Sequence, residues 1–396
     1  MDTIFVVNAG SSSVKFELFG ASHELPRLLR GQMDGIGTHP HLKVKDEQDK
    51  VLIDKDYTKA EVNDAASAQT IISQWVGENM DTVPIAIGHR VVHGGPDFDK
   101  PVLVDDAVLA KLESYVPLAP LHQPSNLGPI RSIRARRPDV PQVVCFDTAF
   151  HRNHPALADY FAIPRALHDE GIRRYGFHGL SYEYVSQRLP QTVPHLAHSR
   201  LIIAHLGSGA SMCALQDGRS MDSTMGFTAL DGLPMGSRPG LIDPGVLLYL
   251  MSRGMGPTAL RNFLYHDCGL KGLSGISNDV RDLLESTDRN AAFALEFFAY
   301  RIAQATGSLT ASLNGLDGLI FTAGIGENAA PVRAAVCERL GWLGITLDEA
   351  ANEAPKSGDG VRKISTASSK VEVYVVPTDE EAMIAKHTLD LVEKRV

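Results

Sequence analysis

A strand–turn–strand segment near the N-terminus has a second copy in the middle of the chain. Ile4–Phe19 (IFVVNAGSSSVKFELF) begins as an apolar run, enters a turn of small residues and leaves as an alternating apolar and polar strand. Leu201–Leu215 (LIIAHLGSGASMCAL) has the same order of strand, polar residue, glycine, small residues and strand. Aligning the first glycine of each turn places Asn8 opposite His205. A copy so far along the chain predicts a duplicated structural unit.

Both turns have a composition suited to phosphate binding. Small residues let backbone N–H groups converge on an anion, and serine hydroxyls and Lys15 add donors to the first turn. A tight serine-rich hairpin turn without a ligand would use the same residue types. The second copy favours the phosphate interpretation, because two such hairpins facing each other would hold a polyphosphate from both sides.

Length and charge narrow the class of protein. A chain of 396 residues exceeds what one hydrophobic core usually supports, so two domains are expected. The net charge of −9 without a basic run argues against nucleic-acid binding. We find no apolar stretch of membrane-spanning length and expect no signal peptide. The four cysteines lack CxxC spacing and lie in or near apolar runs, which predicts reduced, buried thiols in a cytoplasmic protein.

Single charged residues and one histidine occupy unusual places next to glycines or apolar strands. Arg90 follows an apolar strand and precedes a Gly-Gly turn, and Asp147 ends the apolar run VVCF. An arginine suits carboxylate or phosphate recognition, and a carboxylate at a strand end is a common catalytic placement. A surface charge and a helix N-cap are the alternatives. His178 lies between glycines, and Arg238 lies in a long Gly- and Pro-rich loop, a type of loop that is usually functional or disordered.

Three later segments complete the set of candidate motifs. Gly318–Ala329 (GLIFTAGIGENA) is similar to a nucleotide-binding strand–glycine–helix turn, although it lacks the third glycine of the dinucleotide motif. Asp279 and Arg281 lie at the start of a predicted helix, where a capping role is the alternative. Glu380 lies in the first turn of the last predicted helix, where it suits the helix dipole or a metal ion. Other apolar patterns predict helices at Ala60–Met80 and Asn290–Asn314.

Together these segments resemble the acetokinase family of the actin, sugar-kinase and Hsp70 superfamily. The motifs NAGSSSVKF, GHRVVHGG, FDTAFH, YGFHG, HLGSGAS, MGSRPGLIDP, TAGIGEN and PTDEEAMIA occur in family order over nearly the whole chain. The resemblance implies an α/β fold of two duplicated actin-like, ribonuclease H-like ATPase domains with a cleft between them. It implies an N-terminal domain at 1–148, a C-terminal domain with the adenosine-binding loops at 149–380, and a helix at 381–396 that packs back on the first domain.

The implied activity is reversible transfer of the γ-phosphoryl group of ATP to acetate by direct in-line transfer. The products are acetyl phosphate and ADP, and Mg²⁺ is the implied cofactor, with Mn²⁺ as an alternative ion. Such chemistry depends on positioning and charge neutralisation more than on covalent catalysis. The family also implies a cytoplasmic homodimer whose partners are acetate and ATP, with neither nucleic acid nor membrane.

The resemblance also assigns roles to individual residues. It implies that Arg90 holds the acetate carboxylate, and that His178 and Arg238 stabilise the transferring phosphoryl group. It makes Asp147 the catalytic carboxylate, which we expect to order a Mg²⁺-bound water or the substrate because acetate is already ionised near neutral pH. The implied metal ligands are Asn8 and Glu380. The implied acyl-group contacts are Arg90, Val92, Leu121, Phe177 and Ala229. The implied ATP contacts are Ser11, Ser13, Lys15, His205, Leu206, Gly207, Ser208, Gly209, Asp279, Val280, Arg281, Gly324, Ile325, Gly326, Glu327 and Asn328.

The sequence departs from the family pattern at two positions. Ser208 replaces the usual Asn of the second turn, and its shorter side chain is expected to weaken a phosphate contact or to bridge it through water. Ala229 replaces a usual Pro beside the acyl group, and we expect a slightly larger pocket that accepts propionate better. A propionate or butyrate kinase is therefore the nearest alternative. A non-enzymatic ATP-driven clamp is the alternative from another class, and nucleotide binding alone would not require the four catalytic candidates.

Overall fold

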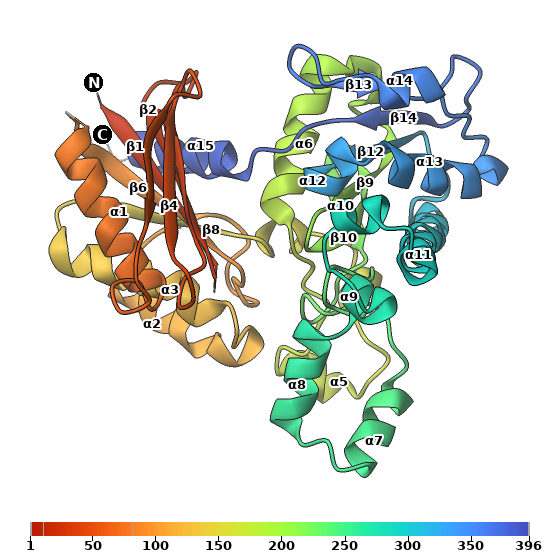
Figure 1. The fold of residues 1–396 in the computed structure, drawn as a ribbon, viewed down its shortest axis with the longest axis horizontal. Helices are drawn as coiled ribbons and strands as arrows, with labels where there is room; N and C mark the ends of the chain where they lie inside the picture. The colour runs from red at the N-terminus through yellow and green to blue at the C-terminus, as the bar shows by residue number, and fades with distance from the viewer. Residues whose placement is uncertain (1, 11, 81, 395–396) are drawn as a thin grey trace. The chain divides into compact units, whose positions relative to one another are not determined.

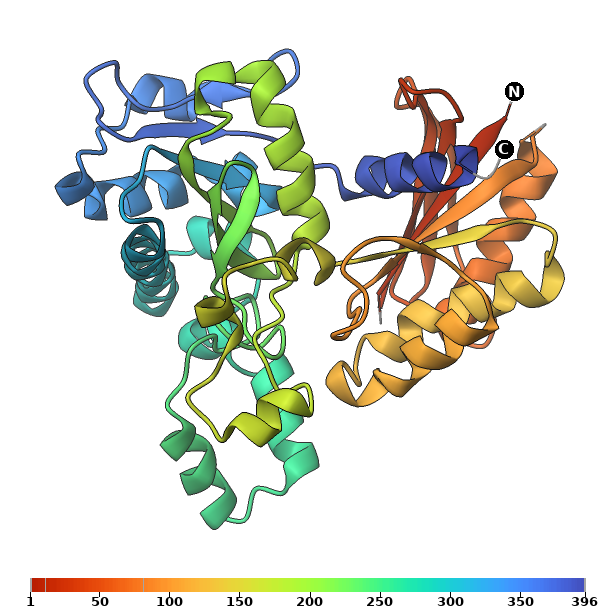
Figure 2. The ribbon, with the colours of Figure 1, turned by 180° about the vertical axis from the view of Figure 1, so that it is seen from behind.

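The chain divides into two compact units, described separately below. The computed structural model describes residues 2–10, 12–80 and 82–394. Unit 1 comprises Met1–Arg152 and Asp379–Val396, and unit 2 comprises Asn153–Thr378. Figures 1 and 2 show the ribbon from two sides. Within the described ranges, no helix has both the length and the apolar character required to span a bilayer.

Unit 1 is built on a mixed sheet. Over the described residues this sheet has eight strands in the order β5-β4-β3-β2-β1-β6-β8-β7. The strands from β1 to β5 pair antiparallel in sequence, whereas β6 runs parallel to β1 and β8 runs parallel to β6. The bounds are β1 (Thr3–Ala9), β2 (Val14–Gly20), β3 (Arg27–Asp34), β4 (His41–Asp46), β5 (Val51–Asp56), β6 (Pro84–Val91), β7 (Val102–Leu103) and β8 (Gln142–Phe146).

Helices cover both faces of this sheet (Figure 2). On one face lie α1 (Ala65–Asn79) and α3 (Gln123–Arg136), which pack with the apolar side chains of β1 and β2 in a single core. The last helix, α15 (Glu380–Glu393), packs on the other face against β1, β6 and β8. A Cβ at Gly88 of β6 would come within 2.3 Å of Thr388 in α15, so the missing side chain allows this close approach. The remaining elements are α2 (Asp106–Ser114) and the short 3₁₀ helices η1 (Val116–Leu118) and η2 (Ala149–His151).

Unit 2 repeats the central arrangement of unit 1. Its described residues form a six-stranded sheet in the order β11-β10-β9-β12-β14-β13. In both sheets an antiparallel hairpin (β1–β2 or β9–β10) pairs through its first strand with a parallel neighbour (β6 or β12). The two copies recognised in the sequence are these two hairpins. The strand bounds are β9 (Arg200–Leu206), β10 (Ala210–Gln216), β11 (Arg219–Ser223), β12 (Gly318–Thr322), β13 (Arg362–Lys363) and β14 (Glu372–Val375).

The helices of unit 2 vary in length, and the longest is α11 (Arg289–Leu313), which packs on β9, β10 and β11. Asp288 caps α11, and alanines at its buried face let it lie close to the sheet. The others are α4 (Ala156–Asp159), α5 (Arg165–Asp169), α6 (Gly179–Thr192), η3 (Pro194–Leu196), α7 (Pro244–Ser252), α8 (Pro257–His266), α9 (Gly269–Ser274), α10 (Val280–Glu285), α12 (Ala323–Asn328), α13 (Ala330–Arg339), η4 (Gly341–Leu343) and α14 (Glu349–Glu353).

The predicted α/β class is confirmed, and local predictions need small corrections. The predicted helix at Ala60–Met80 starts later, because Asp64 accepts a hydrogen bond from the backbone N–H of Ser67 and caps the helix at Ala65. The prediction of four buried cysteines is wrong for Cys268, which is partly exposed, whereas the other three are buried.

Candidate active site

The first glycine turn is held in place by a buried asparagine from α3. The turn itself closes through a hydrogen bond from the Gly10 N–H to the Ser13 carbonyl, at 2.7 Å. Asn126 donates to the carbonyl of Ala9 at 2.5 Å and accepts from the N–H of Val92 at 2.9 Å, so it ties the end of β1 to the end of β6. Sequence reasoning missed Asn126, because its partners are backbone groups of distant strands. The predicted contact Ser11 lies outside the described residues.

Arg90 and Asp147 form the central ion pair of unit 1. They stand at the ends of the parallel strands β6 and β8, and the carboxylate accepts from Nε at 2.8 Å and from Nη2 at 2.5 Å. Arg90 also donates from Nη1 to the side-chain oxygen of Asn8, at 3.2 Å. The structure therefore brings three of the predicted site residues together. It gives Asp147 a charged partner instead of the N-cap role considered as an alternative.

The charges around this pair shift the pKa values of its members. Burial acts to lower the pKa of Arg90, but the charges of Asp147 and Glu380 outweigh it, so that the pKa is raised and the guanidinium stays ionised. Burial raises the pKa of Glu380 to about 7, and the negative charge of Asp147 adds to that effect against the opposing charge of Arg90. A cation that binds nearby would stabilise the ionised form of this carboxylate.

The predicted metal ligands fit a magnesium ion that is bound mainly through phosphate. Asn8 donates from its side-chain nitrogen to Glu381 at 2.8 Å, and its carbonyl oxygen, which accepts from Arg90 Nη1 at 3.2 Å, has one further lone pair for an ion. Glu380 and Glu381 both lie in the first turn of α15. Among the described residues, no three His, Cys, Asp or Glu side chains are grouped as a metal site. Mg²⁺ typically takes one or two protein oxygens and completes its shell with phosphates and water, so these ligands are sufficient.

The other predicted residues of unit 1 lie at the ends of strands and helices or in the first turn. Val92 follows the end of β6 and is buried, and Leu121 precedes α3 and is half-buried. Ser13 is half-buried in the first turn, and Lys15 is exposed at the start of β2, opposite Asn8 in the strand register.

In unit 2, two histidines stack beside the second glycine turn. His178 has a left-handed backbone conformation with φ of 57°, which is unusual for a residue other than glycine, and it precedes α6. Its ring lies on that of His205, with centroids 4.2 Å apart. His178 Nδ1 is hydrogen-bonded to Ser211 at 2.8 Å, and His205 Nδ1 to Ser181 at 2.8 Å. The two serines, which sequence reasoning missed, fix both rings.

A glycine provides the space for the His178 ring. A Cβ at Gly209 would lie 3.2 Å from His178 Nε2, tighter than ordinary contact. The turn closes through a hydrogen bond from the Gly207 N–H to the Gly209 carbonyl, at 3.0 Å. Leu206 ends β9 and is buried, and Ser208 is exposed at the tip of the turn. The His178 ring therefore needs a small residue at this turn, as would a bound phosphate.

Arg238 is positioned by the long loop that precedes α7. Its Nη1 donates to the carbonyl of Ala229 at 3.2 Å, and its guanidinium lies over the ring of Tyr265, 5.6 Å from the centroid. The structure therefore brings two predicted residues, Arg238 and Ala229, into contact. Phe177, the other predicted acyl-group contact of this unit, is buried immediately before His178.

Eight of the predicted ATP contacts line one cavity of about 490 Å³ in unit 2. It is formed by the second glycine turn, the start of α10 and the helix α12. Predicted residues that line it are Gly207, Ser208, Asp279, Val280, Arg281, Gly324, Ile325 and Asn328. Asn278, Leu284 and Ala329 also line it and were not predicted. Asp279 caps α10 and pairs with Arg281, so the capping and binding interpretations are compatible.

Two predicted nucleotide contacts, Gly326 and Glu327, have partners within the protein. Glu327 accepts from Lys356 at 3.2 Å and from the N–H of Thr378 at 3.2 Å, and Gly326 is buried. Neither is among the described residues that line the cavity. Below α12, the buried Arg333 donates to the carbonyls of Gly326 and Glu327, each at 3.0 Å. This arginine holds the C-terminal end of a cavity helix and was also missed from the sequence.

Known proteins are similar to this chain over nearly its full length. The family model described as the acetokinase family matches residues 3–386. An acetate kinase of Nitrobacter hamburgensis is 56% identical over 100% of this chain and 97% of its own, and one of Rhizobium meliloti is 53% identical over 99% of each. The crystal structure of the Porphyromonas gingivalis acetate kinase has a TM-score of 0.88 at 34% identity, covering 99% of this chain and 100% of its own. That of a Francisella tularensis propionate kinase has a TM-score of 0.91 at 38% identity, covering 98% and 100%. The chain belongs to the acetokinase family.

Proposed function

We propose that the protein is an acetate kinase that transfers the γ-phosphoryl group of ATP to acetate, reversibly and with Mg²⁺. The observation that carries this proposal is the network of Asn8, Arg90 and Asp147, in which one guanidinium is held by two hydrogen bonds to a carboxylate and donates to the Asn8 side chain. A protein that only bound nucleotide would not require such a network. The full-length likeness to acetate kinases supports the same reaction.

Arg90 binds the acetate carboxylate in this proposal, and Asp147 positions Arg90. The two hydrogen bonds that Arg90 donates to Asp147 fix the plane of the guanidinium and leave Nη1 to donate to Asn8. A carboxylate oxygen of acetate attacks the γ-phosphorus while the bond to the β-phosphate oxygen breaks, and ADP leaves. Because acetate is ionised near neutral pH, no residue has to remove a proton.

His178 and Arg238 neutralise the equatorial oxygens of the transferring phosphoryl group. Each is fixed before substrate arrives, His178 by Ser211 and Arg238 by the Ala229 carbonyl. Donors that need no reorganisation stabilise a transition state best. Asn8 and Glu380 would hold the ion, which supplies charge neutralisation between the phosphates when bound, and Mn²⁺ prefers the same kind of ligands.

Propionate is the second candidate acceptor. Ala229 lacks the ring carbons of the usual proline, which leaves more room near the acyl group, and a propionate kinase is among the similar solved structures. One methylene group changes discrimination by only about 1–3 kcal/mol, so both acids are expected to react.

We also propose that the protein is a homodimer that uses α7. Most side chains of this helix are apolar, yet none of its residues is buried. Leu248 is 68% exposed and Tyr249 is 60% exposed. An isologous contact lets two identical apolar faces cover each other. Sedimentation of the wild type and of Leu248→Glu tests this. The wild type should be a dimer and the variant should dissociate, whereas a wild-type monomer would refute the proposal.

A hydroxamate assay with ATP and Mg²⁺ tests the function. Acetate is expected to give the most acyl phosphate, propionate less and butyrate least. The assay should be repeated with GTP and pyrophosphate, because Ser208 changes the second phosphate turn. Absence of acyl phosphate with all three acids would refute a kinase of this class.

A further inference from the structure

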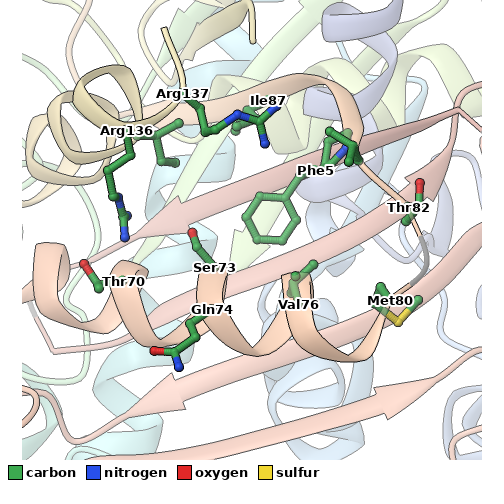
Figure 3. A pocket seen from close by; sticks show the side chains of 14 residues that line it. Phe5, Thr70, Ser73, Gln74, Val76, Met80, Thr82, Ile87, Arg136 and Arg137 are labelled. Carbon is green, nitrogen blue, oxygen red and sulfur yellow. The ribbon is translucent and has the colours of Figure 1, made fainter. Parts of the chain in front are cut away.

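A second cavity, of about 700 Å³, lies in unit 1 beneath the sheet (Figure 3). It is formed by the first halves of β1 and β6, the C-terminal part of α1 and the end of α3. None of its lining residues belongs to the site described above. Its volume is in the range of pockets that bind small organic molecules, and it far exceeds the size of acetate.

The floor of the cavity is apolar. Phe5, Ile87 and Ile133 line it, and each is otherwise packed in the core with less than a tenth of its surface exposed. In Figure 3, Phe5 projects into the middle of the cavity, with Val76 and Met80 of the α1 end beyond it. Such a surface favours the hydrocarbon body of a ligand, at roughly 25 cal/mol per Å² of apolar area removed from water.

The other end of the cavity is polar and positively charged. Thr70 and Ser73 line it from α1, and Arg136 and Arg137 line it from the end of α3 (Figure 3). Arg136 donates to the carbonyl and hydroxyl oxygens of Ser132, neither of which carries a charge. Arg137 donates two hydrogen bonds to the exposed Asp139, so Arg136 is the stronger candidate to bind an anion. None of the described residues that line the cavity is acidic.

We propose that this cavity binds an amphipathic carboxylate, with its charged group at Arg136 and its hydrocarbon body over Phe5. Charge complementarity selects an anion, since two guanidinium groups line the cavity and none of its described lining residues is acidic. The apolar floor selects a body longer than that of the acids proposed as substrates. Binding there stabilises the strands that continue to Asn8 and Arg90, because Phe5 and Ile87 belong to β1 and β6.

Gly77 provides the variant that tests the proposal. It lines the cavity on α1, and a Cβ built at this position meets no atom within 4 Å. Gly77→Phe therefore adds a ring at the cavity edge without a clash at its Cβ, and Gly77→Ala, which adds only a methyl group there, is the matched control. Arg136→Gln removes one cation from the rim, and Arg131→Gln on the same helix removes one that pairs with Glu113 away from the cavity.

The experiment is calorimetric titration of the folded protein with octanoate in the presence of saturating acetate. Acetate occupies the acceptor site of the reaction, so the remaining binding reports the new cavity. We expect one octanoate per chain in the wild type and in Gly77→Ala, and loss of binding in Gly77→Phe. Arg136→Gln should weaken binding about tenfold while Arg131→Gln leaves it unchanged, and uncharged octanamide should bind less tightly than octanoate. The proposal is refuted if octanoate does not bind the wild type, or if Gly77→Phe, with an unchanged melting temperature, binds it equally well.

Discussion

The rings of His178 and His205 are stacked, with 15° between their planes, and each is hydrogen-bonded through Nδ1 to a different serine. His178 comes from the residue before α6, whereas His205 lies on β9. Neither ring can turn without breaking a hydrogen bond and losing the stacked contact. His178 Nε2 is therefore directed toward Gly209 in the second glycine turn, which is the position that its proposed role at the phosphoryl group requires.

Ser211→Ala is expected to lower kcat about tenfold with little change in KM for either substrate. The hydroxyl is bonded to His178 Nδ1 and also to the hydroxyl of Tyr182, so its removal frees the ring that neutralises the phosphoryl group. A group that acts mainly in the transition state affects kcat more than KM. Initial-rate kinetics check this result. Ser220→Ala is the control, because that buried serine is bonded to Cys213 instead; an equal loss in both variants would mean that the effect is only structural.

Asp147→Asn is expected to reduce kcat/KM for acetate by about a hundredfold or more, while ATP still binds. The amide cannot accept both hydrogen bonds from Arg90. It also removes the negative charge that pairs with the guanidinium. Kinetics with acetate as the varied substrate, together with calorimetric titration of ATP, separate the two effects. Unchanged turnover of acetate would contradict the positioning role of Asp147.

The network around Arg333 predicts a separate effect on the nucleotide cavity. Arg333 is buried without a carboxylate, and burial lowers its pKa to about 10. Its guanidinium satisfies Asn352 and two carbonyls at the end of α12, so Arg333→Met leaves several buried acceptors unpaired. We expect a loss of stability on the order of 3 kcal/mol and a higher KM for ATP. Urea unfolding measures the first. Arg339→Met, on the same helix with an exposed partner, should change neither.

Strand ends, glycine turns and the repeated hairpin were predictable because each is local in sequence. Side chains that satisfy backbone groups of distant strands were not. Asn126, Ser211 and Arg333 are typical: each is a common residue on an ordinary helix or strand, and only the folded chain shows its partners. Glu327, which is predicted as an ATP contact, shows the opposite case. It follows the glycines of a recognisable motif, but its carboxylate turns to Lys356 and the backbone of Thr378.

The carboxylate of Glu372 predicts how stability depends on pH. Burial alone would raise its pKa, but hydrogen bonds from Lys363, His195 and Tyr374 lower the pKa from 4.5 to about 2. A folded-state pKa below the unfolded one stabilises the fold above pH 4.5, and this contribution is lost as the pH falls toward 2. Because the side chain is partly exposed, we expect only about 1 kcal/mol. The free energy of unfolding of Glu372→Gln, measured with urea, should differ from that of the wild type at pH 6 and differ less at pH 4. The free energy of unfolding of Glu353→Gln should not differ at either pH.

Ala229→Pro is expected to lower the ratio of kcat/KM for propionate to that for acetate, by about tenfold. The ring carbons of proline would occupy space beside the acyl group, while the carbonyl of residue 229, which accepts from Arg238, is retained. Acetate should therefore react at nearly the wild-type rate, because neither Arg238 nor the smaller methyl group is displaced. Parallel kinetics with both acids give the ratio, and Ala229→Gly, which removes a methyl group without adding a ring, should not lower it. If the ratio in Ala229→Pro equals that of wild type, Ala229 does not line the acyl pocket. If acetate turnover collapses as well, the proline acts through Arg238 and not through the size of the pocket.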